Sequence, residues 1–338
     1  GSAVTAVTAR LIRATRASGV LPGTNSENTV DGMLPGLPPA SSSVGTSGIM
    51  AARCGEPATS TRILPALHCS ATARPPAITL STSPAMTAVI AGASGFVGRS
   101  LIGPLQEWGY RVSTIGRGAS TDTGWDDPDG IRVTVDDADL LINLAGRSVG
   151  CRYTDANRQV IWDSRVDTTR TLNAAVGAAS APPRLWINSS TATIYRHAMD
   201  RPQTEDDGDI GEGFSVDIAK AWEKEFFSGS LPATRRVALR MAIVLGDGAA
   251  LNMLATAARF GAGGAQHEGR WFPHRRYRGI GPEASGPTVW RGHPPTHGRQ
   301  RFSWVHIEDV LRAIRFIDEH EELSGPINVS NPQVSDNH

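Results

Sequence analysis

Cysteine, lysine and long apolar runs are all scarce in this chain of 338 residues. Its three cysteines, Cys54, Cys69 and Cys151, lack the paired spacing of a metal site, and their number is typical of a reduced, cytoplasmic protein. Lysine occurs only at Lys220 and Lys224, so the basic residues are almost all arginine. No apolar run approaches the roughly 20 residues of a membrane-spanning helix.

An excess of charge of either sign is also missing, because 33 basic residues face 33 acidic ones. A chain with no formal net charge has no long-range attraction to nucleic acid or to an acidic membrane surface. We therefore expect neither of these partners, and leave open whether the protein forms a homodimer.

Aromatic residues are absent from residues 1–85, and Phe96 is the first in the chain. The segment is rich in Ala, Ser, Thr, Pro and Gly, and it holds only three acids. Such a composition cannot bury enough apolar surface to offset chain entropy, so we expect residues 1–85 to be disordered and residues 86–338 to form the domain. Two explanations of the segment stay open: a start site assigned upstream of Met86, or a transit peptide for an organelle.

Strand-like and helix-like segments alternate from Met86 onward. The expected strands cover 87–91, 111–115, 139–146, 184–190, 237–244 and 326–329. The expected helices follow residue 97 and cover 155–178, 215–227 and 307–319. This alternation predicts an α/β fold, a parallel sheet with helices on both faces. In the long helix, the inward positions are expected to be Val160, Ile161, Ser164, Val166, Thr169, Leu172 and Val176.

A glycine-rich turn, residues 92–98, joins the first strand to the first helix. This arrangement lays a pyrophosphate against the N-terminus of the helix. Gly92 permits the tight turn, Gly95 lets the backbone approach the phosphates, and Gly98 lets the helix pack closely on the sheet. A purely structural turn is the alternative. The residues expected to bind the nucleotide are Gly92, Ser94, Gly95, Phe96, Val97 and Gly98.

Arg117 follows the second strand, at a place where NAD-binding folds usually carry an acid. A guanidinium there can instead pair with the 2′-phosphate of NADP. The residue favours NADP (NADPH) over NAD, with a solvated surface arginine as the alternative.

Motifs spread along the chain, taken in order, resemble one family. They are the glycine turn, Asn-Leu-Ala-Gly at 143–146, Asn-Ser-Ser-Thr-Ala-Thr-Ile-Tyr at 188–195, and Phe-Ser-Trp-Val-His-Ile-Glu-Asp at 302–309. Together they are similar to the extended short-chain dehydrogenase/reductases, in an atypical branch of epimerase-family, cell-division-inhibitor-like sugar-nucleotide epimerases. The resemblance covers about residues 86–335.

The resemblance implies a Rossmann-type doubly wound parallel sheet with a small substrate region, around 196–214 and 246–305. The family continues after residue 331 into a helix and a small domain, so the substrate region is expected to be truncated at its C-terminal end. The resemblance also implies a small-molecule substrate, such as a sugar nucleotide or a small carbonyl compound. It places Leu144, Ala145 and Gly146 beside the cofactor.

The family's usual chemistry needs a Ser or Thr, a Tyr, and a Lys four residues after the Tyr. Carried over, Thr191 would orient a substrate oxygen and Lys220 would hold the nicotinamide ribose, with a solvated helix lysine as the alternative for Lys220. The tyrosine position is then Val216, which cannot transfer a proton. Tyr195 is the nearest replacement acid, with a packed structural tyrosine as the alternative. Asp217 is a candidate base, or a solvated carboxylate.

Two functions therefore remain open for this chain. One is an NADP(H)-binding oxidoreductase or epimerase. The other is a non-catalytic NADP(H) sensor or scaffold, which the valine at the tyrosine position motivates.

The stretch from 261 to 300 has no periodic pattern and is rich in arginine. Its arginines suit an anionic ligand such as a nucleotide diphosphate, or a solvated basic loop. His293 and His297 are four residues apart, but the two prolines between them prevent a helix, so we expect no metal site. His306 is expected to anchor the last helix.

Overall fold

The computed structural model describes residues 86–261, 278–286, 299–333 and 335–336. Residues 1–85, for which the sequence predicts no fold, lie outside the described residues. So do most of the basic stretch and its histidines 267, 274, 293 and 297.

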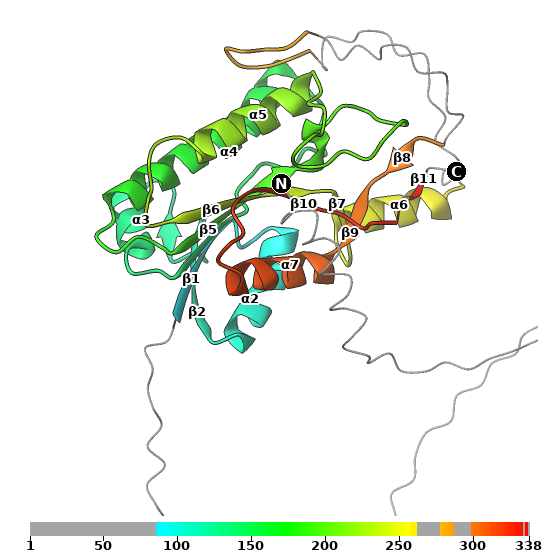
Figure 1. The fold of residues 1–338 in the computed structure, drawn as a ribbon. Coiled ribbons are helices and arrows are strands. Elements are labelled where there is room, and N and C mark those ends of the chain that lie inside the picture. The colour runs from blue at the N-terminus through cyan, green and yellow to red at the C-terminus, as the bar shows by residue number, and fades with distance from the viewer. Residues whose placement is uncertain (1–85, 262–277, 287–298, 334, 337–338) are drawn as a thin grey trace, which may run out of the picture. The chain divides into compact units, whose positions relative to one another are not determined.

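A seven-stranded parallel sheet forms the centre of the fold (Figure 1). Its strands lie in the order β10-β6-β5-β4-β1-β2-β3. They are β1 (Met86–Ala91), β2 (Tyr110–Gly116), β3 (Thr123–Gly124), β4 (Leu140–Asn143), β5 (Leu185–Thr191), β6 (Arg235–Met241) and β10 (Gly325–Val329). The chain proceeds from β1 to one edge, returns, and proceeds to the other edge. This is the predicted doubly wound, Rossmann-type α/β sheet.

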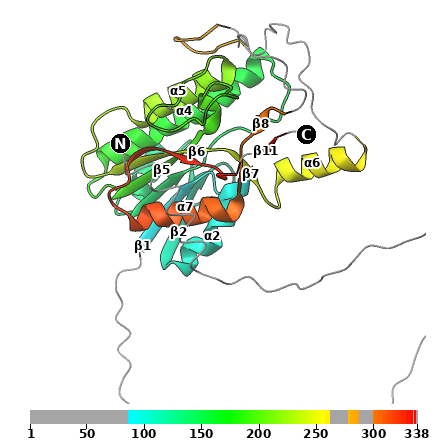
Figure 2. The ribbon, with the colours of Figure 1, turned by 45° about the vertical axis from the view of Figure 1, so that its right-hand side comes forward.

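Helices cover both faces of the sheet (Figures 1 and 2). One face carries α2 (Phe96–Glu107) and α7 (Ile307–Glu319), and the other carries α3 (Pro128–Val135), α4 (Asp155–Ala178) and α5 (Phe214–Phe226). Because both faces are covered, the central strands are nearly continuous apolar runs, as β4 shows with four buried residues.

The expected inward face of α4 is mostly buried in the structure. Ile161, Val166, Thr169, Leu172 and Val176 are buried. Val160 is 45% exposed, so its predicted inward position is wrong. Buried Ala175 lies on the face that packs towards the sheet instead.

Two expected strands end earlier than predicted. The segment 139–146 stops at Asn143, where the chain turns beside the glycine turn. The segment 237–244 divides at Ala242, whose amide donates to Val329 O at 3.0 Å. After this residue β7 (Ile243–Leu245) leaves the main sheet and pairs with β9 (Trp304–His306) in a separate two-stranded sheet.

Several short elements were not predicted from the sequence. They are β3, β9, α3, the 3₁₀ turn η1 (Ala192–Ile194), α6 (Ala249–Arg259), β8 (Arg301–Phe302) and β11 (Ser335–Asp336). The last two pair with each other in antiparallel fashion. The family resemblance implied a helix after residue 331, so β11 departs from it. Figure 2 shows α6 standing apart from the helices that cover the sheet.

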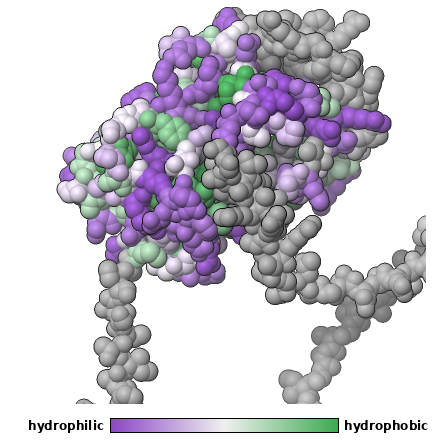
Figure 3. Space-filling view, in the orientation of Figure 1, coloured by the Kyte–Doolittle hydropathy of each residue, from purple (hydrophilic) through white to green (hydrophobic). Residues whose placement is uncertain are grey.

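The face shown in Figure 3 is mostly hydrophilic, with hydrophobic side chains in small patches. Among the described residues, no helix is both long enough and apolar enough to cross a membrane.

Candidate cofactor and substrate site

The glycine turn lies at the carboxyl end of β1, between the ends of β2 and β4. The Gly92 amide donates to Ile115 O at 3.0 Å, and the Leu144 amide donates to Ala91 O at 2.8 Å. Gly92 has a φ of +87°, and a Cβ there would lie 2.8 Å from the backbone of Leu144 and Ala145. The position therefore requires glycine for its conformation and for the close approach.

Gly98 allows the predicted close packing of the first helix. A Cβ at Gly98 would lie 2.6 Å from Gly92 O and 2.7 Å from Ala93 Cα, so a larger residue would push the helix away from the turn. At Gly95 an added Cβ would meet only Gly92 O, at 3.3 Å.

The N-terminus of α2 is open to a ligand. The helix begins at Phe96 after Gly95, which makes no side-chain cap, and its first turn contains no acid. The first N–H groups of a helix have no partner within the helix and carry partial positive charge. This end can therefore hold the diphosphate of a dinucleotide.

Buried polar side chains fix the chain after β4. Asn143 is fully buried, and its Nδ2 donates to Thr169 Oγ1 at 3.1 Å and to Asn188 Oδ1 at 2.7 Å. Its Oδ1 accepts from the Ala145 amide at 3.1 Å, which sets the path of residues 144–146 beside Gly92. Asn143 and Asn188 each open a motif that the sequence analysis used for the family resemblance, but their buried hydrogen-bond network was not predicted.

Arg117 is exposed directly after β2, and it forms no hydrogen bond or ion pair with any described residue. Asp122 is the first acidic residue after Arg117 along the chain, and the sequence analysis did not consider it. Its Oδ2 accepts from the Thr114 amide and hydroxyl, both at 2.8 Å, so this carboxylate is bound to the edge of β2. The Arg117 guanidinium remains available for an anion.

Thr191 stands at the carboxyl end of β5, as the resemblance implied. Its Oγ1 accepts from the Thr193 amide at 3.2 Å and lies 3.0 Å from Thr193 Oγ1. The half-buried hydroxyl is thus held in place at the edge of the sheet where ligands of such folds bind.

The structure places Lys220 in a cavity that Thr191 does not line. Lys220 is exposed on α5, and it lines a cavity of about 600 Å³ with Ile194, Ile210 and Glu283. Neither Thr191 nor the glycine turn lines this cavity. That Lys220 holds the nicotinamide ribose stays a prediction. Val216, one turn earlier on α5, is buried.

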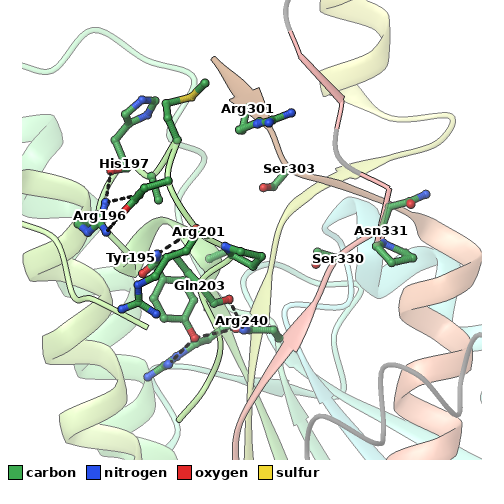
Figure 4. A pocket seen from close by; sticks show the side chains of 17 residues that line it. Tyr195, Arg196, His197, Arg201, Gln203, Arg240, Arg301, Ser303, Ser330 and Asn331 are labelled. Atoms are coloured by element: carbon green, nitrogen blue, oxygen red, sulfur yellow. Dashed lines mark hydrogen bonds and ion pairs between the residues drawn. The ribbon is translucent and has the colours of Figure 1, made fainter. Parts of the chain in front are cut away.

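The hydroxyl of Tyr195 makes two hydrogen bonds (Figure 4). It donates to Asn328 Oδ1 at 2.9 Å and accepts from Arg240 Nη1 at 2.8 Å. Burial raises the pKa of Tyr195, and the hydrogen bond from Arg240 acts in the opposite direction. A role as proton donor stays a prediction, and this geometry favours a packed structural tyrosine.

Arg240 in turn forms a buried ion pair with Glu223 of α5. Its Nε and Nη2 donate to the two carboxylate oxygens at 2.8 Å and 2.7 Å, and Ser190 Oγ donates to Glu223 Oε1 at 2.6 Å. Sequence reasoning missed both members of the pair. An arginine inside the apolar run 237–244 was the available signal, because such a residue needs a partner when buried.

The carboxylate of Asp217 also has hydrogen-bond partners within the protein. Its carboxylate accepts from the amides of Ile280 and Ser285 at 3.1 Å and 2.8 Å, and from Ser285 Oγ at 2.7 Å. It therefore holds the segment 278–286 on α5, which is neither of the roles considered from sequence. His306 anchors α7 as expected, since its Nδ1 accepts from the Glu308 amide at 3.3 Å.

A second cavity, of about 490 Å³, lies beyond the carboxyl ends of β5, β6 and β10 (Figure 4). Residues 195–203 form one side, and Arg301, Ser303 and residues 330–332 form the other. Arg196 and Arg201, on the first side, are ion-paired with aspartates of their own loop, including Asp209 at 2.8 Å and 3.0 Å. The cavity is lined by arginine, hydroxyl and amide groups, which suits a polar small molecule.

Within the described part of the chain, no three His, Cys, Asp or Glu side chains are grouped as a metal site requires. The histidines that suggested one from sequence lie outside it.

Comparison with known proteins identifies the family. The sequence model of the NAD dependent epimerase/dehydratase family matches residues 88–214. Epimerase family protein YfhF of Bacillus subtilis is 29% identical over 74% of this chain and 76% of its own length. Epimerase family protein ML0860 of Mycobacterium leprae is 30% identical over 72% of this chain and 71% of its own length.

Solved structures agree on the fold. Human epimerase family protein SDR39U1, solved with NADPH, superposes with a TM-score of 0.60 at 23% identity, over 75% of this chain and 76% of that one. A nucleoside-diphosphate sugar epimerase from Corynebacterium glutamicum gives 0.57 at 24% identity, over 75% of this chain and 48% of that one. The chain belongs to the NAD-dependent epimerase/dehydratase family and has its NAD(P)-binding, Rossmann-type fold.

Proposed function

We propose that the protein binds NADP(H) at the glycine turn and acts on a small molecule as an oxidoreductase or epimerase. The observation that carries the proposal is the turn itself, where two glycines allow backbone contacts that a Cβ would block, below an uncapped helix N-terminus. The exposed guanidinium of Arg117, which has no partner among the described residues, supports NADP over NAD, and the human relative was solved with NADPH. When bound, this cofactor supplies hydride chemistry.

The chain's own residues would position the reactants. The α2 amides hold the diphosphate, residues 144–146 form the adjoining wall, and the Thr191 hydroxyl orients a substrate oxygen at the end of β5. The polar cavity beyond β5, β6 and β10 would hold the rest of the substrate. A sugar nucleotide suits a cavity lined by hydroxyl, amide and guanidinium groups, and structural relatives were solved with UDP-glucose and with UDP-N-acetylmuramic acid.

A non-catalytic NADP(H) sensor or scaffold is the second candidate. Buried Val216 stands at the family's tyrosine position, and the hydroxyl of Tyr195 already donates to Asn328 Oδ1 and accepts from Arg240 Nη1. Turnover separates the two candidates. Binding of NADPH without its oxidation, across a panel of carbonyl compounds and sugar nucleotides, would favour the sensor.

Isothermal titration with NADPH tests the binding that both candidates require. The unmodified protein is expected to bind one NADPH, and Gly98→Val is expected to abolish binding because its side chain would clash with Gly92 O. Gly103→Ala is the matched control, since a Cβ at Gly103 on the same helix has no atom within 4 Å. Absence of any dinucleotide binding by the unmodified protein would exclude both candidate functions.

Arg117→Asp tests the cofactor preference. Losing a charge-assisted hydrogen bond costs about 1.5–3 kcal/mol, so NADPH affinity is expected to fall by roughly 10- to 100-fold while NADH affinity holds or rises. Arg111→Asp, at the opposite end of β2, makes the same change in charge and is expected to leave the ratio unchanged. An unchanged NADPH-to-NADH ratio in Arg117→Asp would refute the role of the arginine.

A further inference from the structure

The Phe96 ring, at the first position of α2, lies against the link between β7 and α6, residues 246–248. A Cβ at Gly248 would lie 2.8 Å from Phe96 Cδ2 and 2.9 Å from Cγ and Cε2. A Cβ at Gly246 would lie 3.0 Å from Phe96 Cζ. A side chain at either position would have to displace the ring or the link, so the glycines let the backbone of the link follow the surface of the ring.

The link is confined from a second side by α7. A Cβ at Gly246 would lie 2.7 Å from Cγ2 of Ile307, the first residue of that helix. Before the link, β7 pairs in parallel with β9, with Leu245 opposite His306. Gly246 therefore lies between the start of α2 and the start of α7, and the Phe96 ring limits where the chain can proceed into α6.

Phe96 also belongs to the glycine turn. Its backbone opens α2 at the uncapped end where the cofactor phosphates are proposed to bind. Its ring contacts the start of the segment 246–259, which the family resemblance assigns to the substrate side. One residue thus serves both sides of the site, with its backbone towards the phosphates and its side chain towards the link.

We propose that Phe96 is a positioning residue that couples cofactor binding at the glycine turn to the placement of the segment 246–259. The inference rests on the proposed NADP(H) site. A phosphate that orders the first turn of α2 also orders the ring, and the ring orders the backbone packed on it. Such coupling is reciprocal, so a substrate that orders 246–259 strengthens cofactor binding by the same factor.

Hydrogen–deuterium exchange on the full chain, with and without NADPH, tests the coupling. In the unmodified protein NADPH is expected to slow exchange both at 92–101 and at 246–259, the latter by at least about fivefold, the lower end of usual couplings. Phe96→Ala is expected to retain the slowing at 92–101 and to lose it at 246–259, and Phe96→Leu to restore part of it. Ile102→Ala is the control, because this α2 side chain packs on the core instead of the link.

The outcomes separate the two proposals. If NADPH slows exchange at neither segment of the unmodified protein, the cofactor site is wrong and the coupling fails with it. Slowing at 92–101 alone, or equal slowing at 246–259 in Phe96→Ala and the unmodified protein, overturns the coupling and leaves the cofactor site standing. Should Phe96→Ala not fold, Gly248→Ala replaces it, because the added methyl pushes the link off the ring and predicts the same loss.

Discussion

Arg240 and Glu223 form an ion pair whose side chains are only 9% and 10% exposed. Removing two charges from water is costly, so such a pair is stable only when its hydrogen bonds are complete. Ser190 and Tyr195 complete them here, and the pair consequently joins α5 and β6 to the wall of the cavity beyond β5, β6 and β10.

Truncating one member should therefore be costly. Glu223→Ala leaves a buried, unpaired guanidinium, and we expect a loss of about 3–5 kcal/mol in the free energy of unfolding, measured by urea denaturation. The double variant Glu223→Leu with Arg240→Met removes both charges and is expected to cost clearly less. A cost below about 1 kcal/mol for Glu223→Ala would show that the pair is not buried as described.

The aspartates around Arg196 predict a pH dependence. Hydrogen bonds from this guanidinium hold the pKa values of Asp200 and Asp209 below the ordinary value. Because the folded-state pKa is lowered, the stabilisation is present above the unfolded pKa of about 3.9 and is lost only as pH falls through the lower folded value. Carboxyl ¹³C titration should give midpoints below about 3.9 for both aspartates. Arg196→Gln should move them upward, and unmoved midpoints would contradict the assignment.

At the scale of elements, periodicity predicted the long helices and the buried strands, because each has a clear face or apolar run. Motif spacing was less reliable for the site. The i, i+4 pair of Val216 and Lys220 matched the family pattern, but spacing does not fix how a helix is rotated about its axis. In the structure, fully buried Ala219 and sheet-facing Glu223 occupy the inner side, and Lys220 faces outward.

The attachment of 278–286 to α5 can be tested through Asp217. Asp217→Ala removes three hydrogen bonds to Ile280 and Ser285, and we expect faster amide exchange there with a cost of about 1–3 kcal/mol in stability. The comparison is Lys224→Ala, which removes an exposed ion pair with Glu283 and should cost less than about 1 kcal/mol. Equal exchange at 280 and 285 in Asp217→Ala and the unmodified protein would argue against the attachment.

At the scale of the whole molecule, the sequence predicted the glycine turn because its residues are contiguous. It could not locate the cavity beyond β5, β6 and β10, whose walls come from residues 195–203, 301–303 and 328–332. Contacts between such distant segments leave no local pattern. The buried Arg240 was visible only as a polar exception in an apolar run.

The proposed domain boundary at residue 86 makes a prediction for the whole chain. Every described strand and helix begins at or after Met86. Deleting residues 1–85 is therefore expected to leave the melting temperature and NADPH affinity unchanged. A fall of more than about 4 °C, roughly 1 kcal/mol or more for a domain of this size, would show that the segment contributes to the fold. Scanning calorimetry with and without NADPH measures both quantities.

The strand order has a consequence for synthesis on the ribosome. The interior strand β1 is the first of the described strands to be made, and β2 to β6 can add to it outward on both sides as the chain emerges. The edge strand β10 comes last, and with it Asn328, which accepts the hydroxyl hydrogen of Tyr195. A nascent chain can therefore assemble β1 to β6 before the cavity beyond β5, β6 and β10 closes.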